Sequence, residues 1–139
     1  MKSLVWPLTP WVAALWWGSL CAVGFWVVPI LFQELPTAYM AGRLAATLFK
    51  VQCWVTLLCG LFLLLVQSRD ERSGRVTARM FILLGMIAAL LLAFAVAPRI
   101  ALRESLAFWH PVGTLLYALQ CLSAGFVFWL SLGRGSAIR

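Results

Sequence analysis

The side chains that can do chemistry in this chain of 139 residues lie close to the ends of long apolar runs. They are four basic residues, two glutamates and one histidine: Glu34, Arg43, Lys50, Arg99, Arg103, Glu104 and His110. Arg43 and Lys50 are seven residues apart, which places them on one face of a helix with Lys50 about 10 Å further along its axis. Together with a histidine, the side-chain type that titrates near neutral pH, such cations can form a pocket that binds an anion or passes protons.

Two other interpretations of this polar cluster stay open. In the first, Lys50 extends to the lipid headgroups, the arginines anchor helix ends, and the glutamates are their counter-ions. In the second, the cluster holds a metal. One histidine, no pair of carboxylates inside an apolar run, and four cysteines without a C-x-x-C pair make a poor ligand set for haem, copper or zinc. We therefore expect no cofactor and no metal.

The elements that carry these side chains are four long apolar segments. The chain is 64% hydrophobic and 11% charged, whereas a soluble domain has about 25% charged residues. The apolar runs cover residues 11–32, 44–66, 80–97 and 109–132. About 20 apolar residues cross the hydrocarbon of a bilayer, and only a helix satisfies its own backbone there. The sequence predicts one all-α domain over residues 1–139, a membrane four-helix bundle with antiparallel, up-down-up-down helices.

The basic residues predict how the bundle is oriented. The two tails and the second loop hold Lys2, Arg69, Arg72, Arg75, Arg79, Arg134 and Arg139. The opposite side holds Arg43, Lys50, Arg99 and Arg103. An excess of Lys and Arg marks the cytoplasmic side, so we expect a multi-pass protein of the cell inner membrane with both termini in the cytoplasm. Nucleic acid is not an expected partner, because the cations border apolar runs instead of sharing one face. The polar segment 67–78, which contains Ser73 and Gly74, reads as a mobile loop.

Rows of small residues at helical spacing predict close packing of these helices. The rows are Ala14, Gly18 and Ala22; Gly42 and Ala46; Gly85, Ala89, Ala93 and Ala97; and Gly113, Cys121 and Gly125. They can serve within one chain or between copies, and the sequence does not separate the two. The similar strings Val27-Val28-Pro29 and Val96-Ala97-Pro98 suggest that one helical hairpin occurs twice.

Two stretches carry a resemblance to a known family. The first stretch contains Val28-Pro29-Ile30-Leu31-Phe32, Leu35-Pro36, Ala41-Gly42-Arg43-Leu44 and Phe49. The second stretch contains Pro98-Arg99-Ile100, Arg103, Phe108 and His110. In these motifs the chain resembles the transmembrane protein 205-like family. The resemblance implies a four-span inner-membrane protein without an established activity, and it adds weight to Arg43, Arg99 and His110.

Three functional hypotheses follow from the sequence. The first is a non-enzymatic membrane module or accessory subunit, with the lipid bilayer as its surroundings and a second copy or another membrane protein as a partner. The alternative is a small oligomeric transporter or channel that uses the cationic pocket for an anion or for protons. An enzyme is not expected, because the sequence contains no nucleophile with an adjacent base, no phosphate-binding loop and no repeated histidines.

Overall fold

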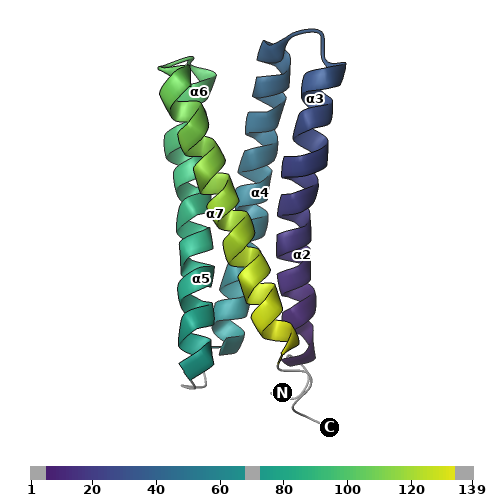
Figure 1. The fold of residues 1–139 in the computed structure, drawn as a ribbon, viewed down its shortest axis with the longest axis vertical. Helices are drawn as coiled ribbons and strands as arrows, with labels where there is room; N and C mark the ends of the chain where they lie inside the picture. The colour runs from purple at the N-terminus through teal and green to yellow at the C-terminus, as the bar shows by residue number, and fades with distance from the viewer. Residues whose placement is uncertain (1–5, 68–72, 134–139) are drawn as a thin grey trace.

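The computed structural model describes residues 6–67 and 73–133, and these residues form four helical rods (Figure 1). The first rod joins a short turn of 3₁₀-helix, η1 (Trp6–Leu8), to α2 (Thr9–Cys21), η2 (Ala22–Val27) and α3 (Val28–Glu34). The second rod is α4 (Ala38–Gln67). The third consists of α5 (Ser73–Leu90), η3 (Leu91–Val96) and α6 (Ala97–Ala101), and the fourth is α7 (Leu106–Leu132). The connections between α3 and α4 and between α6 and α7 lie at the same end of the bundle, which we name the open end (Figure 1).

Each rod is long and apolar enough to cross a membrane. The four spans contain 26, 29, 26 and 27 residues, and 26 helical residues extend about 39 Å at a rise of 1.5 Å per residue. Their outward side chains are apolar; Trp11, for example, is 74% exposed and Leu115 70%. The prediction of an all-helical chain with four helices long and apolar enough to span a membrane is therefore confirmed.

The helices extend beyond the apolar runs, and this corrects the prediction of a loop over residues 67–78. α4 continues to Gln67, and α5 already begins at Ser73, so that Ser73 and Gly74 are helical. Residues 68–72 of that predicted loop lie outside the described residues. A helix longer than the hydrocarbon thickness can continue into the headgroup region.

A proline follows a π-helical segment in both the first and the third rod. η2 and η3 each contain six residues, and a single residue separates η2 from Pro29 and η3 from Pro98. The amide of the residue before each proline donates to the carbonyl five residues earlier, Val28 to Val23 and Ala97 to Leu92. Proline has no amide hydrogen and its ring clashes with the carbonyl four residues before it, and a wider π turn accommodates both. The repeated strings of the sequence thus correspond to repeated local structure.

The half of the bundle opposite the open end is filled by a packed core. Its buried centre is formed by Ala13, Trp16, Leu20, Cys59, Leu63, Ile82, Ala124 and Val127. Gly85 lies against the Trp16 ring, because a Cβ added to this glycine would approach two ring carbons at 2.8 and 2.9 Å. Gly125 likewise faces Trp17, and Gly60 faces Met86. These glycines therefore serve packing within one chain.

Two hydrogen bonds between polar side chains join α2 to α4 inside the bundle. The Trp16 indole Nε1–H donates to Thr56 Oγ1 at 3.1 Å, and both residues are fully buried. One turn further along, the Gln52 amide donates to Ser19 Oγ at 2.9 Å. Such bonds join α2 to α4 where hydrocarbon supplies no other partner, and each contributes about 0.6 kcal/mol on average in a membrane protein.

We expect Gly85→Leu to destabilise the bundle by about 1–3 kcal/mol, because overpacking forces the Trp16 ring out of its position. Gly18→Leu is the matched control, since a Cβ on Gly18 meets nothing within 4 Å. The measurement is the unfolding of the purified protein by dodecyl sulfate. Equal unfolding midpoints for the two variants would contradict the assigned packing.

The Trp16–Thr56 hydrogen bond can be tested by a double-mutant cycle with Trp16→Phe and Thr56→Val. We expect a coupling energy of about 0.6 kcal/mol, with about 1.7 kcal/mol as the upper bound, because bonds of this kind average that value in membranes. The same dodecyl sulfate titration gives the four free energies of unfolding. A coupling energy of zero would mean that the two side chains act independently.

Candidate functional site

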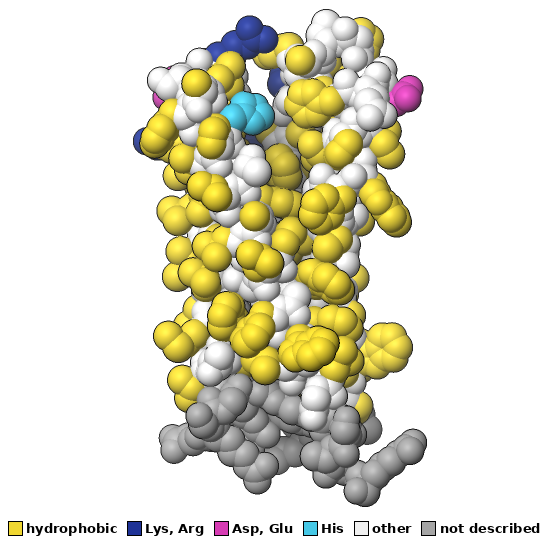
Figure 2. Space-filling model, in the orientation of Figure 1, with side chains coloured by type: hydrophobic (Ala, Val, Ile, Leu, Met, Phe, Trp, Pro, Cys, Tyr) yellow, Lys and Arg dark blue, Asp and Glu magenta, His cyan; other side chains and the backbone are white. Residues whose placement is uncertain are grey.

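The open end contains a cavity of about 760 Å³. Residues from α3, α4, α6 and α7 and from both π-helical segments line it. Figure 2 shows a hollow between two columns of the molecule at this end, with the histidine at its rim and basic side chains beside it. In Figure 1 the end of α3 and the start of α7 lie apart here, whereas α2 and α7 pack closely at the other end. The cavity volume falls within the range of about 300–1,000 Å³ that is usual for small-molecule sites.

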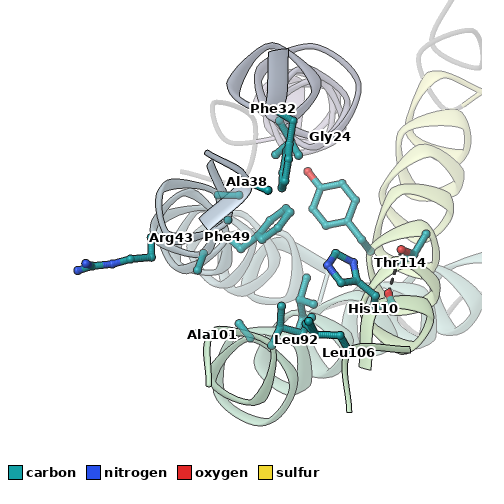
Figure 3. A pocket seen from close by; sticks show the side chains of 18 of the residues that line it. Gly24, Phe32, Ala38, Arg43, Phe49, Leu92, Ala101, Leu106, His110 and Thr114 are labelled. Atoms are coloured by element: carbon teal, nitrogen blue, oxygen red, sulfur yellow. Dashed lines mark hydrogen bonds between the residues drawn. The ribbon is translucent and has the colours of Figure 1, made fainter. Parts of the chain in front are cut away.

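Apolar and small side chains form most of the cavity wall. Phe32 and Phe49 point into the cavity from α3 and α4 (Figure 3). Gly42 and Ala46, the row predicted on the second helix, also line it, and a Cβ on Gly42 would meet nothing within 4 Å. This row therefore keeps space open instead of packing against another helix.

Tyr117 is part of the wall in the deeper half of the cavity. Its hydroxyl donates to the Leu20 carbonyl oxygen at 2.7 Å, and its ring lies 5.2 Å from the Phe49 ring, centroid to centroid. The approach depends on Gly24, where an added Cβ would lie 2.5 Å from a Tyr117 ring carbon. Gly24 belongs to η2, so the first π-helical segment supplies both the glycine and the turn beside that bond.

Two arginines share one aromatic ring at the mouth. The guanidinium carbons of Arg43 on α4 and of Arg103 in the α6–α7 connection both lie 5.8 Å from the centroid of the Tyr39 ring. Arg103 and Ser105 adopt left-handed backbone conformations, with φ of 59° and 39°. Such conformations cost on the order of 1–3 kcal/mol each and concentrate at functional sites. The strained turn places the Arg103 cation across the mouth, over the start of α4.

His110 is the polar side chain that faces the interior of the cavity most directly. Figure 3 shows its ring between α7 and the aromatic residues, while the Arg43 side chain leaves the cavity in the opposite direction. The backbone carbonyl of His110 accepts a hydrogen bond from the Thr114 hydroxyl at 3.0 Å. Within the described residues the imidazole itself makes no hydrogen bond, so that its nitrogens are available to a molecule in the cavity.

The structure brings three of the predicted site residues together and separates the others. Arg43, Arg103 and His110 line the cavity. Glu34 and Lys50 are exposed and are not part of its wall, and Arg99 stacks on Trp109 at 4.4 Å instead. Lys50 shares a helical face with Arg43, and both residues are exposed. At the depth of Lys50 it is the neighbouring Phe49 that points into the cavity, so Lys50 is not part of the wall (Figure 3).

Sequence reasoning missed the aromatic part of the site. Tyr39, Phe49 and Tyr117 give the cavity its shape, but an aromatic residue in an apolar run is indistinguishable from one that faces lipid. One signal for the aromatic wall was present in the sequence: Gly24 is small enough to admit the large Tyr117 ring. The two residues can be paired only once the first rod and α7 are known to be neighbours.

The cysteines and acidic residues do not assemble into a ligand set. Cys21, Cys53, Cys59 and Cys121 are free thiols. Over residues 6–67 and 73–133, no group of three or more His, Cys, Asp or Glu side chains lies close enough to hold a metal ion. Among the described residues that line the cavity, none is acidic.

Comparisons with known proteins give one result at the level of family. Neither the curated proteins nor the solved structures provide a match to the chain. A family model described as Domain of unknown function (DUF4149) matches residues 11–108, which include Arg43 and Arg103 and end just before His110. Since this match covers more than half of the sequence, the chain belongs to the DUF4149 family.

Proposed function

We propose that this protein is a non-enzymatic membrane module that holds an apolar guest from the bilayer in the cavity at its open end. The observation that carries the proposal is the cavity itself, about 760 Å³ with a wall made mainly of apolar and small side chains. Ligand sites are usually largely preformed, apolar and equipped with a few polar groups, and this cavity has that composition. The non-enzymatic part rests on the sequence, in which no nucleophile stands beside a base.

The route into the cavity supports a guest that comes from the membrane. Several wall residues are also exposed on the surface of the bundle, among them Phe25 at 69% and Leu122 at 71%. Both belong to spans that face hydrocarbon, so the cavity is continuous with the lipid-facing surface. An apolar molecule can therefore enter sideways without crossing water.

A transporter or channel for anions or protons has less support. Lys50, the deepest cation of that hypothesis, is not on the cavity wall. On the far side of the cavity, the side chains of Trp16, Leu20, Ile82 and Val127 are at most 1% exposed and fill the bundle. The cavity is thus closed toward the packed half of the bundle, which suits binding better than passage.

We further propose an antiparallel, up-down-up-down bundle in the cell inner membrane, with both termini in the cytoplasm and the open end outside. Support comes from the excess of basic residues in the tails and the second loop. Arg75 and Arg79 of that set lie in α5, whereas Lys2, Arg69, Arg72, Arg134 and Arg139 lie outside the described residues. Relatedness to the transmembrane protein 205-like family is part of the same proposal.

The surroundings of the protein are proposed to be the lipid bilayer, with a second copy or another membrane protein as partner and no nucleic acid. Of the four predicted small-residue rows, the one on α2 is where such a partner would pack. Gly18, its middle member, is exposed and faces open space. The other glycine-containing rows are occupied within the chain or line the cavity.

The orientation predicts the behaviour of reporter fusions. Green fluorescent protein at the C-terminal end is expected to fluoresce in intact cells, because that end lies in the cytoplasm, whereas alkaline phosphatase at the same place stays inactive. Alkaline phosphatase inserted between Glu34 and Ala38 is expected to be active. The reverse pattern would place the open end in the cytoplasm.

Apolar occupancy of the cavity can be tested with a photoreactive diazirine analogue of hexadecanol and the protein in nanodiscs of a zwitterionic lipid. We expect adducts on wall residues such as Phe49 and Leu92, and a loss of at least about tenfold in their yield with Gly42→Trp, since the new ring occupies the cavity. Mass spectrometry of peptides locates the adducts.

Gly18→Trp is the matched control, because it also replaces a helical glycine next to open space, but outside the cavity wall. Its wall adducts are expected to equal those of the wild type. Equal labelling of the wall in both tryptophan variants, or adducts confined to the outer surface in the wild type, would contradict an apolar guest.

A further inference from the structure

We propose that the guest is a single-chain amphiphile with an anionic head, of the long-chain carboxylate class. Its head lies at the mouth with Arg103 and His110, and its chain runs along α7 toward Tyr117. This inference rests on the proposed function, since it names the chemistry of the guest in the same cavity. It specifies the charge of the guest's head and the number of its hydrocarbon chains, and an apolar cavity alone specifies neither.

The length of the cavity fits one hydrocarbon chain. Its wall includes residues of α7 from Leu106 to Leu122, a distance of about 24 Å at 1.5 Å per residue. An acyl chain of a membrane lipid covers half of the hydrocarbon core, on the order of 15 Å. The cavity therefore has the length for one chain together with a head, and the rings of Tyr117 and Phe49 are part of its wall.

The charge at the mouth selects the head. Arg43, Arg103 and His110 line this part of the cavity, and among the described lining residues none is acidic. In the part of the chain that the structure describes, no salt bridge neutralises either arginine, and both guanidinium groups lie beside the same Tyr39 ring. Two cations that share one neutral ring leave a positive potential at the mouth, which an anionic head reduces and a neutral or cationic head does not.

The position of the cations matches the depth at which such a head belongs. Arg43 lies in the second turn of α4 and Arg103 lies three residues before α7, so both are at the edge of the spans. His110 is one turn inside α7 and points into the cavity (Figure 3). A carboxylate at the headgroup level thus lies at the depth of Arg103 and His110, while its chain stays in the apolar part; the Arg43 side chain is directed away from the cavity (Figure 3). The strained backbone at Arg103 is explained if this cation has to be held over the mouth.

The test measures how well unlabelled amphiphiles displace the photoreactive hexadecanol analogue from the wild-type cavity at pH 8. The competitors are palmitate, hexadecanol, hexadecyltrimethylammonium and dipalmitoylphosphatidylglycerol. We expect palmitate to compete about tenfold more strongly than hexadecanol, a factor that corresponds to 1.4 kcal/mol, and the ammonium compound to be the weakest. We expect the two-chain lipid to compete less than palmitate.

Variants then assign the selectivity to the mouth. With Arg103→Gln, the advantage of palmitate over hexadecanol is expected to fall to about twofold or less. Lys50→Gln is the matched control, because Lys50 is an exposed cation on α4 away from the cavity, and it is expected to retain the tenfold advantage.

The outcomes separate this inference from the proposed function. Equal competition by palmitate and hexadecanol in the wild type overturns the anionic head and leaves an apolar guest in place. Stronger competition by the two-chain lipid overturns the single chain. An equal loss of selectivity in Arg103→Gln and Lys50→Gln shows a general effect of surface charge and overturns the assigned site. Absence of any wall labelling in the wild type removes the proposed function together with the inference.

Discussion

Inside hydrocarbon every backbone amide and carbonyl needs a partner within the protein, and the rest of this structure depends on how two prolines meet that requirement. Pro29 and Pro98 lie within the last two turns of the first and third rods. Each rod responds with six residues of π-helix, in which amides reach carbonyls five residues earlier. The helices continue to the membrane edge, but a wider turn changes the direction in which all later side chains point. Both changes fall at the level where the bundle stops being a packed core and begins to enclose a cavity.

The two halves of the bundle use small residues in opposite ways. Gly85 admits the Trp16 ring, so that large side chains fill the half that holds the buried core. Gly24 admits Tyr117 and thereby ends that core with a hydrogen bond to α2. Beyond this point Gly42 is opposed by nothing, and the same kind of residue leaves a space. A membrane helix gains no hydrophobic energy from covering such a space with protein, because lipid is equally apolar. The cavity is consequently compatible with a stable bundle.

The sequence predicted the fold class well because membrane helices are specified by composition and length, both of which are read directly from apolar runs. Their ends were less predictable: Ser73 and Gly74 resemble a loop, yet beyond the hydrocarbon they only have to continue an existing helix. For the site, charge alone was a partial guide. Arg43, Arg103 and His110 lie on the cavity wall, but Glu34, Lys50 and Arg99 do not, because a charged residue near a helix end satisfies the same rule whether it faces a cavity or the headgroups. The aromatic walls depend on contacts between α2, α4 and α7, and no local pattern encodes these.

At the mouth of the cavity, the arrangement of Arg103 costs free energy that a purely structural module would have no reason to spend. Arg103 holds a left-handed backbone, and its charge lies next to a ring already approached by Arg43. Strain and like charge both oppose this arrangement. Glu104 follows Arg103 in the same connection, but it is not among the described residues that line the cavity. Arg99 shows how a cation can be placed near a helix end without such strain. It lies in the regular helix α6 and stacks on the Trp109 ring of α7. A turn that only connected α6 to α7 would not need a cation over the cavity. An anionic head at the mouth would offset this cost at Arg103, and this adds to the support that the cavity itself gives to a binding site at the open end.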